Sequence, residues 1–252
     1  MSTTTITAPQ APTSILIDGS PWTAPAQPPP VTPPVTPPVT TPPVTTPTPS
    51  TRLWPASWDD FPGVKFAEWT SPYHPTIAGQ LVRALSVVDS SGNPAVDPSQ
   101  NGYNGYTLDT FRCKTREGPR AAGAGIFTRW AYMEIVALAG DHADGEQAYG
   151  GGGMSITNSK LLCGGPGATN LFAADKSHGT IVLDTDYFGW VPGTSKPGYN
   201  VRINVDGCDK TIVRNCVFDD RLPNVFDSPI GEWTNNQWLN VATGVLRPYP
   251  HP

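Results

Sequence analysis

The chain has 252 residues, with 30 Pro, 25 Gly, a formal net charge of −5 and only 15% charged residues. This length is enough for one large domain with appendages. The sparse positive charge argues against a nucleic-acid-binding surface, and no apolar run approaches the length of a membrane span. We therefore expect no nucleic-acid partner and no membrane insertion.

Residues 1–27 are rich in Thr and contain one short apolar run followed by a Trp. The segment has no Lys or Arg and no long apolar core, so it does not resemble a secretory signal peptide. It is either a disordered tail or a docking peptide. In the second case the apolar run adds a strand to a partner's sheet and the Trp anchors it. The docking residues would be Ile15, Leu16, Ile17 and Trp22.

Residues 28–50 repeat Pro-Pro-Val-Thr without a single charged residue. Repeated Pro fixes φ and holds the chain in a polyproline II helix. At about 3.1 Å per residue, such a linker reaches roughly 70 Å. The chain is thus expected to consist of an anchor (1–27), a stalk (28–50) and a folded domain (51–252).

The first part of the folded domain is aromatic and interrupted by Pro, and we interpret residues 51–105 as an N-terminal cap and the first coils. Trp54, Trp58 and Trp69 are expected in the core of this cap, with a sugar-stacking surface as the alternative. Residues 78–88 form either a short helix or an irregular first strand. The Pro-rich residues 240–252 would cover the other end, because an open end of a β-solenoid exposes unpaired strand edges.

A six-residue phrase recurs four times in the second half of the chain. An apolar residue precedes an Asn or Asp by two positions, and a large apolar residue follows it by three. The copies are Ile156–Leu161, Val182–Tyr187, Val213–Phe218 and Trp233–Trp238. Repetition at roughly 20 to 30 residues is typical of a coiled β architecture, in which each coil keeps its core strand and varies its loops.

The two apolar positions of the phrase can both point inward only if the chain bends near the polar residue, because a straight strand alternates its faces. Asn and Asp suit such a bend since they tolerate left-handed backbone. Stacked coils would align the polar residues in a ladder and the apolar residues in two internal rows. The ladder is Asn158, Asp184, Asn215 and Asn235, and the rows are Ile156, Val182, Val213, Trp233 and Leu161, Tyr187, Phe218, Trp238. The alternative is four ordinary strands of a β-sandwich.

Longer phrases in this region resemble a known family. They are His-Ala-Asp-Gly-Glu-Gln at 142–147, Thr-Asn-Leu-Phe at 169–172, Val-Arg-Asn-Cys-Val-Phe-Asp-Asp at 213–220 and Trp-Thr-Asn-Asn-Gln-Trp at 233–238. In this order they resemble right-handed parallel β-helix proteins of actinobacteria and their phages, within the pectate-lyase-like superfamily. The resemblance implies an all-β fold, a right-handed parallel β-helix. Glu146 stands where the family usually has Ile, so we expect this side chain to face solvent.

The resemblance and the order of the segments imply a phage virion protein, a minor tail or fibre-like appendage. It would assemble in the host cytoplasm and act outside the cell. Residues 1–27 would bind other virion proteins, the β-helix would bind host cell-surface glycan, and a homotrimer is expected by analogy with phage appendages. The alternatives are a polysaccharide lyase or glycoside hydrolase, and an inert structural decoration of the particle.

The candidate site residues follow from chemistry and spacing. His142 and Asp144 are two apart, so an extended chain projects both to one face. They are the candidate catalytic residues, since an imidazole and a carboxylate can serve as base and acid. The candidate glycan-binding residues are these two together with Gln147 and Trp190, whose indole suits stacking on a pyranose. The competing interpretation is that Asp144 and Gln147 satisfy backbone groups at a tight turn.

The four cysteines are Cys113, Cys163, Cys208 and Cys216, and no pair has the Cys-x-x-Cys spacing of a metal or redox site. We expect buried, reduced thiols, with a Cys208–Cys216 disulfide as the alternative. The sequence contains no calcium loop of recognisable spacing, and residues 150–153 lack the Lys and Ser/Thr of a phosphate loop. We therefore predict neither a metal nor a cofactor.

Overall fold

The computed structural model describes residues 16–17, 20–21, 53–174 and 178–252. Two short strands, β1 (Leu16–Ile17) and β2 (Ser20–Pro21), form an antiparallel hairpin near the N-terminus. Of the predicted docking residues, Leu16 and Ile17 make up β1. Ile15, Trp22 and the linker 28–50 lie outside the described residues.

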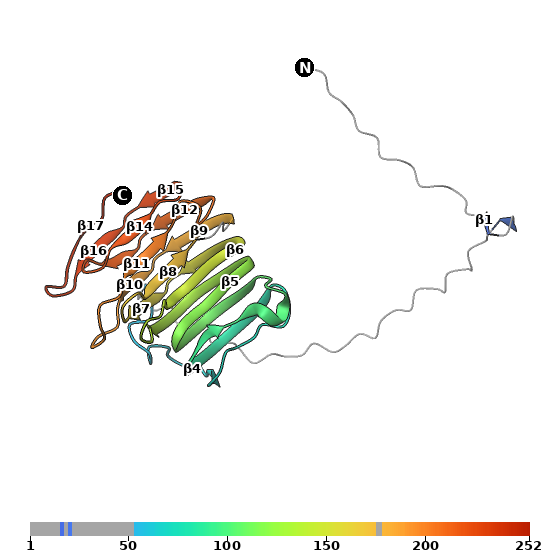
Figure 1. Cartoon of the computed structure of the whole chain (residues 1–252), viewed down its shortest axis with the longest axis horizontal. Coiled ribbons are helices and arrows are strands. Elements are labelled where there is room, and N and C mark those ends of the chain that lie inside the picture. Colours follow the sequence, from blue (N-terminus) through green and yellow to red (C-terminus); the bar gives the residue numbers. More distant parts are fainter. Residues whose placement is uncertain (1–15, 18–19, 22–52, 175–177) are drawn as a thin grey trace, which may run out of the picture. The chain divides into compact units, whose positions relative to one another are not determined.

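The rest of the described chain is a coil of parallel strands (Figure 1). The first half contains β3 (Ala67–Trp69), β4 (Gln80–Val96), a short 3₁₀-helix (Pro98–Asn101), β5 (Tyr106–Val136), β6 (Asp144–Thr157), β7 (Lys160–Gly164) and β8 (Thr169–Ala173). The second half contains β9 (His178–Asp184), β10 (Tyr187–Trp190), β11 (Tyr199–Ile203), β12 (Lys210–Arg214), β13 (Val217–Asp219), β14 (Asn224–Phe226), β15 (Ile230–Thr234), β16 (Gln237–Asn240) and β17 (Val245–Pro248).

The strands form three parallel faces. The β9 face contains the end of β6, then β9, β12 and β15. The β10 face contains the end of β5, then β7, β10, β13 and β16. The β11 face contains the start of β6, then β8, β11 and β14. Consecutive strands therefore visit the three faces in turn, which confirms the predicted parallel β-helix.

The chain turns from the β9 face to the β10 face at a residue with left-handed backbone. Such residues recur through the coils with φ from 50° to 63°: Ala84, Thr110, Trp130, Asn158, Thr185, Asn215 and Asn235. The predicted bend is therefore confirmed at three of the four Asn/Asp positions. In the second copy the bend lies at Thr185, one residue beyond Asp184.

This shift changes which side chains face inward. Leu183 pairs with Ile156 and Val213, and Phe188 pairs with Leu161 and Phe218. Both Leu183 and Phe188 are fully buried. The prediction of Val182 and Tyr187 for these rows was wrong, because adjacent apolar residues leave the pattern ambiguous and a shift of one residue exchanges the two faces.

The predicted polar ladder forms at this corner. The Asn235 side-chain amide donates to Asn215 Oδ1 at 3.0 Å, and the Asn215 amide donates to Asp184 Oδ1 at 3.1 Å. Asn158 leaves the ladder, and its Nδ2 donates to the carbonyl of Leu53 at 3.0 Å. Three of the four predicted ladder positions are therefore linked directly by hydrogen bonds.

The interior is apolar and increasingly aromatic toward the C-terminus. Phe188 stacks on Phe218 with ring centroids 5.3 Å apart, and Phe218 stacks on Trp233 at 6.4 Å. Trp238 and Tyr249 stack at 4.1 Å beside them. Burial of each such ring contributes roughly 1.5–3 kcal/mol. This cluster fills the last coils, and β17 runs antiparallel to β16 at their edge.

The aromatic residues near the start of the domain pack against the outside of the β10 face. Phe61 lies in a buried cluster with Tyr132, Leu162 and Val191, and Trp58 packs against it. The guanidinium of Arg112 lies 4.4 Å from the Trp58 ring. This segment therefore covers the side of the coil.

The coil begins within residues 51–105, the region interpreted as the cap and first coils. Strand β4 pairs in parallel with β5 from Gln80 onward, so residues 80–88 are a strand and the helical alternative was wrong. The four cysteines are buried and unpaired, which confirms the predicted thiols and excludes the Cys208–Cys216 disulfide.

Candidate functional site

A groove on the β11 face collects several sequence-predicted site residues. It encloses about 350 Å³ and is lined by His142, Asp144, Gln147, Gly167, Thr169, Phe172, Tyr199 and Arg202. We call it the Asp144 groove. It contains three of the four predicted glycan-binding residues and both predicted catalytic candidates.

The strand register places these side chains in two rows. Asp144 pairs with Thr169, and Thr169 pairs with Tyr199 on the next coil. Gln147 pairs with Phe172, and Phe172 pairs with Arg202 in the same way. Strands on neighbouring coils lie about 4.8 Å apart, so each row crosses three coils within about 10 Å. The groove is a product of coil stacking, because its two rows come from β6, β8 and β11.

The Asp144 carboxyl is the polar centre of the groove. The residue is 5% exposed, and no described residue donates a hydrogen bond to the carboxyl. Burial raises its pKa to about 7, and the nearby charge of Glu117 adds to this rise while Arg116 opposes it. At neutral pH the carboxyl is therefore divided between its acid and its carboxylate form.

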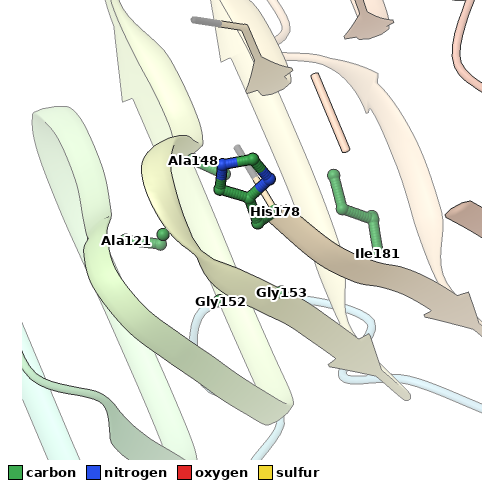
Figure 2. A pocket seen from close by; sticks show the side chains of 7 residues that line it. Ala121, Ala148, Gly152, Gly153, His178 and Ile181 are labelled. Carbon is green, nitrogen blue, oxygen red and sulfur yellow. The ribbon is translucent and has the colours of Figure 1, made fainter. Parts of the chain in front are cut away.

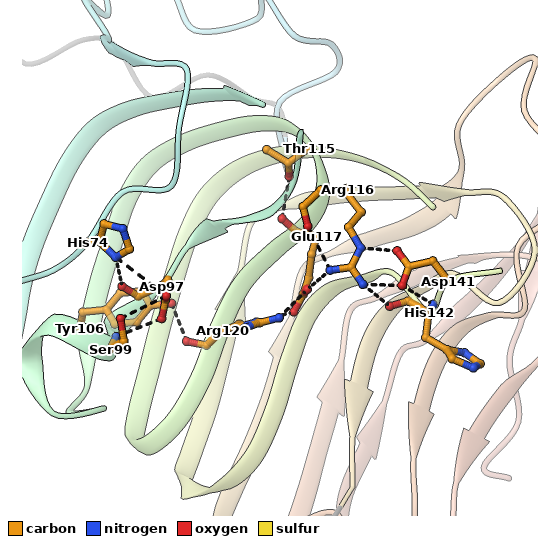
Figure 3. A network of polar contacts seen from close by, with 11 residues as sticks. His74, Asp97, Ser99, Tyr106, Thr115, Arg116, Glu117, Arg120, Asp141 and His142 are labelled. Atoms are coloured by element: carbon orange, nitrogen blue, oxygen red, sulfur yellow. Dashed lines mark hydrogen bonds and ion pairs between the residues drawn. The ribbon is translucent and has the colours of Figure 1, made fainter. Parts of the chain in front are cut away.

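A network of charges holds the chain beside Asp144 (Figure 3). Glu117 is 2% exposed and accepts hydrogen bonds from Arg116 at 2.7 Å and from Arg120 at 2.6 and 2.9 Å. Arg116 also pairs with both carboxylate oxygens of Asp141, and this interaction lowers the pKa of Asp141. The Asp141 carboxylate in turn accepts the backbone N–H of His142 at 2.8 Å. The network thus fixes the backbone from which His142 and Asp144 project.

Arg202 supplies a positive charge on the far side of the groove. Its guanidinium carbon lies 5.3 Å from the Tyr199 ring centroid and 5.6 Å from that of Phe172. Its Nε donates to Asn204 Oδ1 at 3.3 Å, and no carboxylate of the described chain forms an ion pair with it. The groove therefore combines aromatic rings with polar groups that the protein leaves unpaired, as ligand sites commonly do.

Trp190 lies in a different groove. That groove encloses about 370 Å³ on the β10 face, and its lining includes Lys160, Tyr187 and Arg221. Its polar groups are already engaged: Lys160 Nζ donates to Ala56 O at 2.7 Å, Arg221 is paired with Asp219, and Trp190 Nε1 donates to Thr194 at 3.0 Å. The structure does not bring Trp190 to the other predicted site residues.

Sequence reasoning missed Thr169, Phe172, Tyr199 and Arg202. A signal for them exists, because three four-residue phrases occupy equivalent places on successive coils. They are Asp-Gly-Glu-Gln at 144–147, Thr-Asn-Leu-Phe at 169–172 and Tyr-Asn-Val-Arg at 199–202. If the three phrases are aligned residue by residue, their first residues form one row of the groove and their last residues form the other.

Glu146 points into the coil, so the expectation that it faces solvent was wrong. It is fully buried, and neither of its carboxylate oxygens has a hydrogen-bond partner among the described residues. Burial raises the pKa of Glu146 to about 8. Glu146 pairs with Leu171 on the next coil, and both residues are fully buried.

The pocket around His178 is too small for an organic ligand (Figure 2). It holds about 10 Å³ and is lined mainly by small residues, among them Ala121, Ala148, Gly152 and Gly153. This is room for about one water molecule. The His178 pocket is therefore a weaker ligand-site candidate than the Asp144 groove.

Comparison of the chain with protein-family models, curated proteins and solved structures finds no match. Within the described ranges, no group of three or more His, Cys, Asp or Glu residues is arranged to hold a metal ion. The same part of the chain contains no helix that is both long and apolar enough to span a membrane. The described strands form a parallel β-helix. The Asp144 groove is the feature of this fold from which we infer a function.

Proposed function

We propose that this β-helix binds a glycan in the Asp144 groove. The observation that carries the proposal is one cavity that combines the Phe172 and Tyr199 rings with the Asp144 carboxyl and the Arg202 guanidinium, neither of which forms an ion pair within the described chain. Aromatic rings provide apolar surface for a sugar ring, and the polar groups bind its hydroxyls. The row geometry suits a polymer, since equivalent positions repeat on three coils.

We further propose that the protein is a phage virion appendage that presents this β-helix to a host cell surface. The support is the resemblance of the phrases in 142–238 to phage and actinobacterial β-helix proteins, together with the order of anchor, stalk and solenoid. In this proposal residues 1–27 attach the chain to other virion proteins.

A polysaccharide-cleaving enzyme is the second candidate, and one observation favours it. The pKa of Asp144 lies at about 7, which suits a group that transfers a proton at neutral pH. Hydrolysis with two carboxylates requires a second acid across the sugar bond. Among the described lining residues Asp144 is the only carboxyl, so the groove favours binding over hydrolysis.

The experiment is a binding assay of the full chain on isolated cell envelopes of actinobacteria, followed by an assay of released sugar ends. Phe172→Ala with Tyr199→Ala should abolish binding, while Trp190→Ala, in the other groove, should retain it. Release of reducing or unsaturated ends that depends on Asp144 would establish the enzyme instead. Binding that survives loss of both rings would contradict the proposal.

A further inference from the structure

We infer that the ligand of the Asp144 groove is a glycan that carries an oxyanion, a carboxylate or a phosphate, and that this group binds the Arg202 guanidinium. We also infer that Asp144 weakens this binding as the pH rises through neutrality. Both inferences rest on the proposed glycan-binding function. The first specifies the chemical class of the glycan, and the second specifies how pH changes its affinity.

Most N–H donors of the Arg202 guanidinium have no partner in the described chain. A guanidinium has five N–H donors in a planar fork that matches a carboxylate or a phosphate. Only the Nε of Arg202 has a described partner, Asn204 Oδ1 at 3.3 Å. Both Nη groups remain without a partner in the described chain. An anionic group of a ligand in the cavity would satisfy them.

Two aromatic rings lie beside the Arg202 guanidinium. The Phe172 and Tyr199 rings lie 5.6 and 5.3 Å from its guanidinium carbon. The rings restrict the side chain before a ligand arrives, so little rotamer entropy is lost on binding. Such an arginine is suited to recognise a fixed anion, and lysine would lack the planar fork.

Asp144 lines the same cavity as Arg202 but forms no ion pair with it. The charged groups near its carboxyl are Glu117, Arg116, Asp141 and Arg202. Arg116 forms ion pairs with both Glu117 and Asp141, and these two carboxylates offset its electrostatic stabilisation of the Asp144 carboxylate.

The carboxyl of Asp144 is buried and its pKa is about 7. Below this pH it is neutral and can donate a hydrogen bond to an oxyanion. Above it the carboxylate repels an anion bound at Arg202. Protonation falls from about nine-tenths at pH 6 to about one-tenth at pH 8, so affinity is expected to fall up to about tenfold. His142 also lines the groove, so its contribution must be separated from that of Asp144.

The test applies the full chain at pH 6 and pH 8 to an array of neutral, carboxylated and phosphorylated glycans. We expect binding to charged glycans only, and the two charged sets distinguish a carboxylate from a phosphate. Arg202→Gln should weaken binding at least tenfold. Arg83→Gln is the matched control, since Arg83 is an exposed arginine on the β9 face.

Both variants, Asp144→Asn and His142→Asn, are tested singly and together: in the His142→Asn background, Asp144→Asn should abolish the remaining pH dependence. Loss of the whole pH dependence in His142→Asn alone would overturn the role of Asp144. If Arg202→Gln does not fold, competition by inorganic phosphate against wild-type binding replaces it. Equal binding of neutral glycans, or full binding by folded Arg202→Gln, would overturn the inference while leaving glycan binding intact. The absence of any bound glycan would instead overturn the proposed function.

Discussion

Replacement of Glu146 by Ile should stabilise the protein, and the gain should grow with pH. Glu146 is fully buried without a described hydrogen-bond partner, and its pKa is raised from 4.5 to about 8. A pKa raised in the folded state means that the unfolded chain loses the proton first. The contribution of this group to stability is complete below pH 4.5 and declines as the pH rises toward 8.

The magnitude follows from the two pKa values. Each pH unit between them costs about 1.4 kcal/mol, so the penalty reaches about 3 kcal/mol at pH 7 and about 5 kcal/mol above pH 8.5. Domains of this kind are stable by only about 5–15 kcal/mol. Glu146→Ile removes the penalty and fills the site with apolar atoms beside Leu171.

The assay is urea unfolding of wild type and Glu146→Ile at pH 5 and pH 8, with the free energy of unfolding extrapolated to water. The gain in the free energy of unfolding should be about 3–4 kcal/mol larger at pH 8 than at pH 5. Glu146→Gln is the matched control, because it removes the charge but keeps a buried polar group. Equal gains at both pH values, or a loss at pH 8, would refute the reasoning.

Three further predictions concern the coil itself. Phe218→Ala removes a fully buried ring that stacks on Phe188 and should cost about 3–5 kcal/mol in urea unfolding. Asn215→Ala loses both ladder bonds of a residue at φ 57° and should lower stability by about 1–2 kcal/mol, whereas Asn215→Gly should recover the backbone part of that loss. Arg112→Ala removes contacts with the Trp58 ring and carbonyl, so limited proteolysis near Trp58 should accelerate while the coil stays protected.

The candidate site was partly predictable. His142, Asp144 and Gln147 were found because they fall within one phrase, and short spacing in an extended chain predicts a common face. Phe172 and Arg202 were not found, since each comes from a different coil and their proximity depends on the exact register between coils. Trp190 was assigned to the same site on its chemistry alone, and the register places it on another face.

The sequence by itself predicted a coiled β architecture, because apolar residues recur at fixed distances on both sides of a bend-forming residue. The parallel pairing between coils then excluded the β-sandwich that the sequence left open. The sequence also predicted three members of the polar ladder, Asp184, Asn215 and Asn235, because stacked Asn and Asp side chains can hydrogen-bond to one another. Only the tertiary structure decided the orientation of Glu146 and the exact inner rows, Leu183 and Phe188 included. Where two apolar residues are adjacent, or a carboxyl replaces an apolar residue, local preference cannot choose a face. That choice is made by pairing with the coils on either side.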